Sequence, residues 1–575
     1  MSRPQLVLVR LWPWLLAFLV LGPLLGRGYV LTYDMVFVPD LAMRSDFLGL
    51  GTGLPRAVPS DAVVAALDTV VPGDVLQKVL LLAALGLAGT GARRLVADDS
   101  VAAQLAATSL YLWSPFVAER LGIGHWPLLL TYAALPWIYD AARRGRAGER
   151  TLPQLVLWLG LASLSAAGGV IAAVFAIVCV AGRSRDAVRR SVLVAAAAVA
   201  VNAPWLVAGA LHGSGALSDP RGVEAFAARA EGYLPLPLTL LGLGGIWNAE
   251  VVPPSREGWA AVVQLVVVVA VGLVGVSTWR SRVLLRDRLG LGLAAVIGLV
   301  VALVGSVAPD LLGWVVANIP GGGLFRDGSR FVALLAPLAA SLFGTGAAVL
   351  VAKVAERASR ILVATVLALV PLALMPDLGL ALAGRLSAVD YPEEYAAARS
   401  AIQERQDAGV EGDVLLLPFS SYRLPSWNDD RPTLDPTGRY LTPNYLASDV
   451  LYVDGEAIAG EDQRAARVSD LLESDLEPEA LAGALAAEGI AWVVLERDAQ
   501  EMVGDAAPSA DLAGLPVVHE GTDLVVWELP GADPARAGTA REVAMAVAWL
   551  AGLGTLAAAV AALLRRRTRA HRNVF

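Results

Sequence analysis

The strongest constraint on the fold of this chain is a series of long apolar stretches along most of its length. A helix needs about 20 mostly apolar residues to cross a hydrocarbon core about 30 Å thick. Hydrophobic residues make up 56% of the 575 residues and charged residues only 17%, whereas a soluble chain carries about 25% charged residues. The sequence therefore predicts an α-helical polytopic membrane protein with about twelve transmembrane helices, not a soluble, fibrous or disordered chain. The stretches cover residues 11–27, 76–92, 100–118, 126–142, 153–167, 168–182, 191–211, 260–279, 289–308, 331–352, 361–384 and 541–564.

Two short stretches and the first stretch of this series need a separate interpretation. The stretches 153–167 and 168–182 are joined by an Ala-Ala-Gly-Gly sequence, and they form either two short helices or a re-entrant pair buried in the bundle. The first stretch has no Ala-x-Ala cleavage site, and Arg27 and Gly28 follow it directly. We therefore expect it to be a retained helix and not a cleaved signal peptide.

Arginines alternate between the linkers of this series. Every second linker is basic, as the positive-inside rule requires of cytoplasmic segments. This pattern predicts a plasma-membrane protein with both termini in the cytoplasm and the long loops outside. The basic segments lie at residues 3–10, 93–94, 143–150, 183–190, 280–288, 353–360 and 565–572.

One external segment is long enough to fold by itself. Residues 386–540 are polar but contain short β-type apolar runs at 414–418, 491–495 and 524–528, with helical patterns at 395–406 and 478–488. Strands that alternate with helices predict a small α/β domain. The expected organisation is a transmembrane domain at 1–385, this extracytoplasmic domain at 386–540, and a last transmembrane helix with a basic tail at 541–575.

The charge of the chain is divided unevenly between these parts. The formal net charge is −8. It is the sum of −21 in residues 386–540 and +13 in the remainder. The overall acidity excludes a generally cationic nucleic-acid binder. Because the external domain repels anions, an anionic lipid-linked substrate is expected to bind the Arg-bearing membrane loops instead.

Three classes of membrane protein fit this organisation. A transporter usually carries ionisable residues inside its spans, and here the spans are nearly free of charge. A non-catalytic scaffold would dock partner enzymes on the acidic domain, and its polar loops would lie apart from one another. An enzyme that acts on a lipid-linked substrate would gather polar groups at the external membrane surface, where the sequence has them. The transporter and the scaffold remain alternatives.

The first external loop carries the candidate base. Asp34 lies between Tyr33 and Met35 in an aromatic-rich sequence, so it is a candidate general base for an acceptor hydroxyl, and Tyr33 is a candidate substrate contact. The neighbouring aromatics are expected to raise the pKa of Asp34 by desolvation. The alternative is a solvated loop carboxylate. The same loop contains Asp40, Asp46, Asp61, Asp68 and Asp74.

The sequence at 114–126 places three more chemical groups at a membrane boundary. Glu119 is a candidate catalytic group that orients the sugar or binds a divalent cation such as Mg²⁺ or Mn²⁺. Arg120 suits a phosphate because its planar guanidinium matches phosphate oxygens. His125 would stand at headgroup level and contact substrate. The alternatives are a structural Glu119–Arg120 pair and an interfacial anchor at Trp126.

The strongest phosphate signal lies at 319–331. Three consecutive glycines permit a nest of backbone N–H groups that faces an anion, and Arg326 and Arg330 flank it at the start of an apolar stretch. The alternative is a glycine turn in which Arg326 pairs with Asp327.

Loops of the external domain supply the last candidates. Trp427 and Asn428 belong to a Trp/Tyr/Asn/Asp/Arg-rich region that can grip sugar rings by stacking and hydrogen bonding, or can simply pack the domain onto the membrane part. The sequence has no P-loop, G-x-G-x-x-G or H-E-x-x-H motif. A lipid-linked donor is therefore expected in place of a nucleotide sugar.

In this arrangement the chain resembles the GT-C superfamily of membrane glycosyltransferases, and in particular its actinobacterial cell-envelope members. The likeness lies in the helix series, the first-loop acid, the C-terminal external domain, and the sequences SPFVAER at 114–120 and LFRDGSRF at 324–331. It implies a polyprenyl-phosphate sugar donor, transfer of arabinofuranose or mannose to an envelope glycan or glycolipid, and the base role for Asp34. Many of these enzymes have two adjacent acids at this position, whereas this chain has one.

Overall fold

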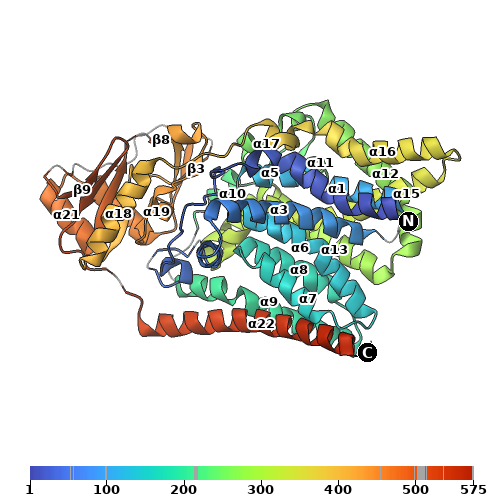
Figure 1. Ribbon diagram of the computed structural model, residues 1–575, viewed down its shortest axis with the longest axis horizontal. Coiled ribbons are helices and arrows are strands. Elements are labelled where there is room, and N and C mark those ends of the chain that lie inside the picture. The colour runs from blue at the N-terminus through green and yellow to red at the C-terminus, as the bar shows by residue number, and fades with distance from the viewer. Residues whose placement is uncertain are drawn as a thin grey trace.

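The structure is a computed structural model that describes residues 1–51, 53–55, 57–96, 100–212, 218–453, 455–497, 499–501, 512, 514–534 and 536–572. A body of helices occupies one end of the molecule and a sheet-containing domain the other (Figure 1). Both chain termini lie at the end of the helical body that faces away from this domain. Which end is cytoplasmic stays a prediction.

Helices occupy every stretch that was predicted to span the membrane. Within the described residues, nine are long and apolar enough to do so, while α7 (Leu152–Ala162) and α8 (Ala166–Val180) are shorter. The count of twelve spans therefore remains a prediction, and the stretch at 153–182 forms two separate short helices. The nine candidate spans contain α1 (Arg3–Leu21), α3 (Gly73–Ala92), α4 (Val101–Leu112) taken together with the helix that follows it, α9 (Arg185–His212), α12 (Trp259–Arg282), α13 (Leu285–Val307), α15 (Ala336–Ala352), α16 (Arg357–Leu374) and α22 (Thr539–Arg572). The helix α6 (Trp126–Arg146) is not among these nine.

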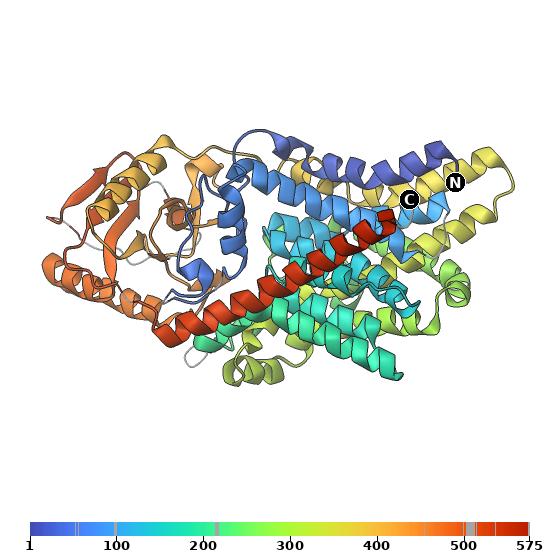
Figure 2. The ribbon, with the colours of Figure 1, turned by 60° about the horizontal axis from the view of Figure 1, so that its bottom comes forward.

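Short helices and turns connect these elements on the side of the domain. α22 leaves the domain and runs obliquely along the helical body (Figure 2). The connecting helices are α2 (Ser60–Asp68), α5 (Pro115–Gly122), α10 (Gly222–Ala225), α11 (Leu236–Leu241), α14 (Pro309–Asn318) and α17 (Gly379–Ala383), with the 3₁₀ turns η6 (Gly322–Phe325) and η7 (Gly328–Leu334) among others.

Two predicted boundaries were wrong, and proline explains both. The stretch 100–118 is not one helix: α4 ends at Leu112, and Pro115 opens the separate helix α5, where its fixed φ and missing N–H suit the first position. The predicted loop at 114–126 is therefore largely helical. The stretch 361–384 also breaks, because α16 ends at Leu374 and Pro376 follows, which cannot continue a helix.

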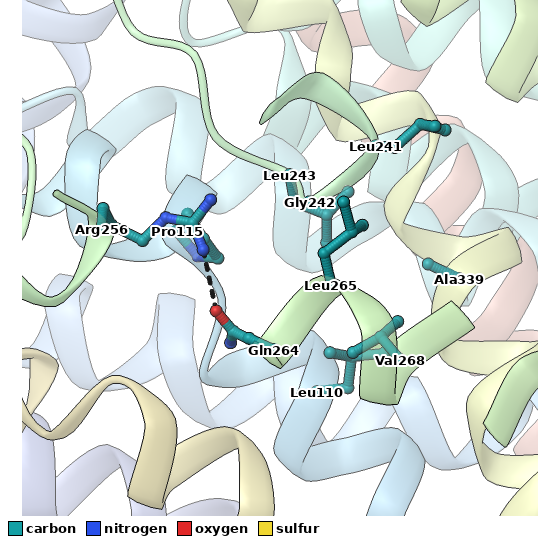
Figure 3. A pocket seen from close by; sticks show the side chains of 10 residues that line it. All are labelled: Leu110, Pro115, Leu241, Gly242, Leu243, Arg256, Gln264, Leu265, Val268 and Ala339. Atoms are coloured by element: carbon teal, nitrogen blue, oxygen red, sulfur yellow. Dashed lines mark hydrogen bonds between the residues drawn. The ribbon is translucent and has the colours of Figure 1, made fainter. Parts of the chain in front are cut away.

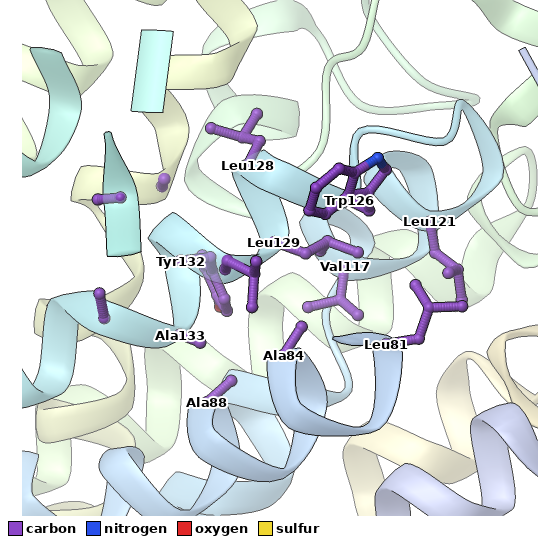
Figure 4. Packing of buried hydrophobic residues seen from close by; sticks show 14 of the residues in the cluster. Leu81, Ala84, Ala88, Val117, Leu121, Trp126, Leu128, Leu129, Tyr132 and Ala133 are labelled. Carbon is purple, nitrogen blue, oxygen red and sulfur yellow. The ribbon is translucent and has the colours of Figure 1, made fainter. Parts of the chain in front are cut away.

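Packing against two neighbours fixes α5 in place. Ala84 and Leu81 of α3 are buried opposite Val117 and Leu121 of α5, while Ala88 of α3 lies beside Ala133 of α6, the helix that Trp126 opens (Figure 4). Small residues let helices approach closely where lipid gives no hydrophobic drive for association. α5 thereby becomes a rigid support for the polar residues that it carries.

The domain that was predicted to be extracytoplasmic contains a five-stranded sheet of order β4-β1-β7-β10-β9. We call this domain and the first loop external after their predicted side of the membrane. β1 (Asp413–Leu417) runs parallel to β4 (Tyr445–Leu446) and β7 (Ile490–Glu496), and β10 (Leu524–Glu528) is antiparallel to β7 and to β9 (Val517–Glu520). These strands and the helices α18 (Glu393–Asp407) and α21 (Pro478–Ala487) confirm the elements predicted there. Further elements are α19 (Thr437–Tyr440), α20 (Gln463–Leu472), β5 (Leu451–Val453) and β6 (Glu456–Ile458).

A second, smaller sheet joins the domain to the first external loop. It has the order β3-β2-β8, with β2 at Tyr422–Pro425, β3 at Thr433–Leu434 and β8 at Ala499–Glu501, and β3 lies at the edge of the domain nearest the helices (Figure 1). Tyr33 pairs with this edge: its N–H donates to Pro432 O at 2.6 Å, and its carbonyl accepts from Leu434 N at 2.8 Å. The first loop thus extends the sheet of the domain.

Candidate functional site

Asp34 lies at the junction between the helices and the external domain. Its N–H donates to the carbonyl of Ile123 at 3.2 Å, and its side chain is 40% exposed. His125 Nε2 lies 3.0 Å from one carboxylate oxygen, and the Tyr422 hydroxyl donates to the other at 2.5 Å. The carboxylate is thus held from both sides, by a residue of the membrane part and by a residue of the domain.

The contacts of His125 define its tautomer. Its Nδ1 lies 3.4 Å from Arg120 Nη1, and a guanidinium can only donate. Nδ1 therefore accepts, and the ring proton sits on Nε2, where it is donated to Asp34. Burial lowers the pKa of His125, and this outweighs the opposing effect of the hydrogen bond that the ring donates to Asp34, so the ring is neutral near pH 7.

Behind His125 the network continues to the loop at 319–331. Arg120 Nη2 donates to Ser329 Oγ at 2.5 Å, and Arg120 Nη1 lies 3.6 Å from Asp327. Arg330 Nε donates to the same carboxylate at 2.8 Å. Burial raises the pKa of Asp327, but Arg330 and Arg120 outweigh it and lower the pKa to about 2. We call these residues, together with Asp34, His125 and Tyr422, the Asp34 cluster.

Within this cluster the two arginines differ in access. The Arg120 side chain is fully buried, whereas that of Arg330 is 30% exposed. The charge of Arg330 also acts on Asp34. Arg330 is therefore the guanidinium of the cluster that an anion can reach, and Arg120 is a buried link between His125 and Asp327.

The predicted rise in the pKa of Asp34 was wrong. Burial does raise it, but the hydrogen bonds from His125 and Tyr422 and the charge of Arg330 more than offset burial, and the pKa lies below its usual value. Hydrogen bonds to the charged form favour that form. Asp34 is therefore ionised at neutral pH and able to accept a proton.

The glycine-rich loop does not form the expected nest. The N–H groups of Gly322 and Leu324 donate to backbone carbonyls within 3₁₀ turns, at 2.8 and 3.1 Å. Arg326 pairs with Glu461 of the domain at 2.8 Å and stacks on the Phe226 ring at 4.9 Å. The structure brings Arg330 to Asp34 and places Arg326 elsewhere, against the domain.

Glu119 also lies away from Asp34, although it precedes Arg120. Successive helical residues point about 100° apart, and the carboxyl of Glu119 contacts that of Glu231. Glu231 accepts from Arg256 Nε at 2.7 Å, and Arg256 Nη1 donates to Gln264 at 2.9 Å. We call these four residues the Glu231 cluster. Arg256 and Gln264 line a small, mostly apolar cavity that is separate from the Asp34 cluster (Figure 3).

The three predicted substrate contacts other than His125 occupy different environments. The Tyr33 hydroxyl donates to Glu250, and its ring meets that of Tyr422 edge-on at 6.1 Å. Asn428 is fully buried and donates to the carbonyl of Arg431 at 3.1 Å. Trp427 is half-buried and packs against Tyr391 at 5.0 Å. Tyr33 therefore borders the Asp34 cluster, while Asn428 and Trp427 belong to the packing of the domain.

Sequence reasoning missed three members of the site. Tyr422 lies 388 residues from Asp34, and no local pattern links the two. Asp327 was considered only as a partner of Arg326, and Ser329 was given no role. The position of Asp327 and Ser329 in the LFRDGSRF sequence, beside two arginines, was the signal that could have identified these two residues.

The residues around Asp34 do not fit a metal site. Its carboxylate oxygens accept hydrogen bonds from His125 and Tyr422, and the positive charge of Arg330 acts on it, so a cation would compete with these groups for the carboxylate. Glu119 likewise faces Glu231 and Arg256. Among the side chains that the structure describes, no group of three or more His, Cys, Asp or Glu residues is arranged to hold a metal ion.

Comparison with solved structures identifies similar folds. The arabinofuranosyltransferase AftD from Mycobacteria matches over 94% of this chain and 40% of its own, with 14% identity and a TM-score of 0.52. Its R1389S mutant matches over 93% and 42%, with 15% identity and a TM-score of 0.53. This chain thus spans about two fifths of the length of that enzyme, and the likeness concerns the fold. No protein-family model and no curated protein matches the sequence.

Proposed function

We propose that this protein is a membrane glycosyltransferase that moves a monosaccharide, with arabinofuranose favoured over mannose, from a polyprenyl-phosphate donor to a glycan or glycolipid acceptor of the cell envelope. The observation that carries the proposal is the meeting of a base and an accessible cation in one cluster. Asp34 comes from the first external loop, and Arg330 comes from the loop at 319–331. The fold likeness to an arabinofuranosyltransferase supports both the reaction class and the sugar.

In the proposed reaction the bond between the anomeric carbon and the donor phosphate oxygen breaks. The bond between that carbon and the acceptor oxygen forms. Asp34 takes the proton of the acceptor hydroxyl. Arg330 binds the phosphate and stabilises the charge that grows on it as polyprenyl phosphate leaves. All atoms and charges are then accounted for by the donor, the acceptor and one carboxylate.

The buried residues of the cluster have supporting roles in this proposal. Arg120 binds Nδ1 of His125, so that Nε2–H points at Asp34. Asp327 fixes Arg120 and Arg330 relative to each other. A non-catalytic scaffold is less well supported, because its polar loops were expected to lie apart.

The test is a transfer assay with the purified full-length protein in nanodiscs. The donors are polyprenyl-phosphate arabinofuranose and polyprenyl-phosphate mannose, each labelled in the sugar, and the acceptors are short arabinan and mannan alkyl glycosides. We expect transfer from the arabinofuranose donor, and its loss in Asp34→Asn. The control Asp310→Asn makes the same change at the exposed start of α14. Full transfer by Asp34→Asn, or no transfer from either donor, would overturn the proposal.

A further inference from the structure

The external domain contributes a side chain directly to the candidate base. Tyr422 and His125 each bind a different oxygen of the Asp34 carboxylate. A carboxylate has about four lone-pair positions, so these two bonds fix its orientation and leave acceptor capacity for a hydroxyl proton. The partial exposure of the side chain keeps that capacity open to a substrate.

The backbone explains why Tyr422 reaches this position. In the small sheet, Tyr422 of β2 pairs with Leu434 of β3, and Leu434 N donates to the carbonyl of Tyr33. Tyr33 adopts a φ of 39°, in the left-handed region that is uncommon for a residue other than glycine. This turn directs the following residue, Asp34, back toward the Tyr422 hydroxyl.

Many other contacts hold the domain in this register on the first loop. Arg44 of the first loop is buried against the domain and donates to Gly438 O and Pro443 O at 2.6 and 3.0 Å. Arg439 binds Asp61 at 2.9 Å, and Tyr391 donates to Phe37 O at 2.9 Å. The position of Tyr422 is therefore set by an extensive interface and not by a single flexible side chain.

We infer that Tyr422 is a positioning residue for Asp34, through which the external domain completes the transferase site. The inference rests on the proposed function and deepens it. The hydroxyl stabilises the ionised carboxylate and fixes its direction, while the ring packs edge-on against Tyr33. The domain is then part of the catalytic unit, and a helical part without it would hold an incompletely oriented base.

The variant Tyr422→Phe tests this because it removes the hydroxyl and retains the ring. Loss of a hydrogen bond to the charged form raises the pKa of Asp34, so the acid limb of the kcat/KM profile should move to higher pH. We expect kcat to fall about tenfold or more, as for a hydrogen bond to a charged group, with little change in the donor KM. The control is Tyr452→Phe, the same change at an exposed position of β5 in the same domain.

The outcomes separate the inference from the proposed function. An unchanged melting temperature with a lower kcat and a shifted acid limb supports the inference. Wild-type kcat and pH profile in Tyr422→Phe, when Asp34→Asn is inactive, overturn the inference alone. A lower melting temperature with an unshifted acid limb also overturns it, since that is the result of a purely structural role. If the wild-type protein transfers no sugar, the proposed function fails and the inference falls with it.

Discussion

Two polar clusters begin at adjacent residues of α5 and differ in their exposure and in the parts of the molecule that they join. The Asp34 cluster, reached through Arg120, joins two external loops and the external domain, and it includes the partly exposed side chains of Asp34 and Arg330. The Glu231 cluster, reached through Glu119, is buried: Glu119, Glu231 and Arg256 are each at most 4% exposed. The comparison teaches that residue type and membrane-boundary position do not define a site. A site is defined by side chains that a substrate can reach and that lie near a candidate base.

The largest difference between the clusters should appear in transfer activity. We expect Asp34→Asn to lower kcat by about 10²–10⁴-fold, the usual contribution of a general base, because the amide cannot accept the proton. Glu119→Gln should leave kcat nearly unchanged, since its carboxyl lies in the other cluster. Initial rates with labelled donor measure both. Equal losses in the two variants would contradict the separation of the clusters.

Stability should depend on the buried ion pair of the Glu231 cluster. Arg256→Met leaves Glu231 buried without its partner, and breaking one side of a buried ion pair costs about 3–5 kcal/mol. Denaturant unfolding in detergent micelles measures this loss. The control Arg221→Met removes an exposed arginine, for which a change of about 0–1 kcal/mol is expected. Similar losses in the two variants would show that the Glu231 cluster is not structural.

Donor binding should distinguish Arg326 from Arg330, two of the three arginines that were predicted for the phosphate. Arg330→Ala should raise the donor KM about tenfold or more, since a hydrogen bond to a charged group contributes about 1.5–3 kcal/mol. Arg326→Ala should raise it less, because Arg326 binds Glu461 and Phe226. Titration of the polyprenyl-phosphate donor at fixed acceptor measures both values. A larger effect in Arg326→Ala would move the phosphate site away from Asp34.

The smallest expected effect is a shift in pH dependence. The base form of Asp34 exists above its pKa, which its hydrogen bonds and the charge of Arg330 hold below the usual value of an aspartate, so the wild-type acid limb should lie below the usual range of an aspartate. His125→Ala removes a donor, raises that pKa and moves the limb to higher pH, whereas the amide of His125→Gln should partly restore it. Profiles of kcat/KM from pH 3 to 8 check the sign, and a limb that moves to lower pH in His125→Ala would contradict it.

The sequence was sufficient for the elements whose signal is local. Long apolar stretches predicted the helices, and the continuous apolar run at 491–495 predicted a buried strand, because a segment covered on both faces needs apolar residues at consecutive positions. The break at Pro115 could also have been read from the sequence. It was missed because the hydrophobicity continues across it, and the loop expected around Glu119 was in fact a helix.

The site was harder to predict because it is assembled over long distances in the chain. Asp34 and Arg330 were identified from charge and position, and the structure brings them together. The directions of the Glu119 and Arg120 side chains depend on how α5 packs against α3 and α6. The position of Tyr422 beside Asp34 depends on the pairing of Tyr33 with β3. The pKa of Asp34 was mispredicted for the same reason, since its hydrogen-bond donors are distant in the sequence.

If the proposed function holds, the Asp34 cluster, and not the Glu231 cluster, binds the donor. A cryo-EM structure of the full-length protein in nanodiscs with a non-hydrolysable polyprenyl-phosphonate arabinofuranose analogue tests it most directly. We expect the phosphonate within hydrogen-bond distance of Arg330 and the anomeric carbon on the side of Asp34. Density for the phosphonate against Arg256 in the apolar cavity, or against Arg326, would contradict it.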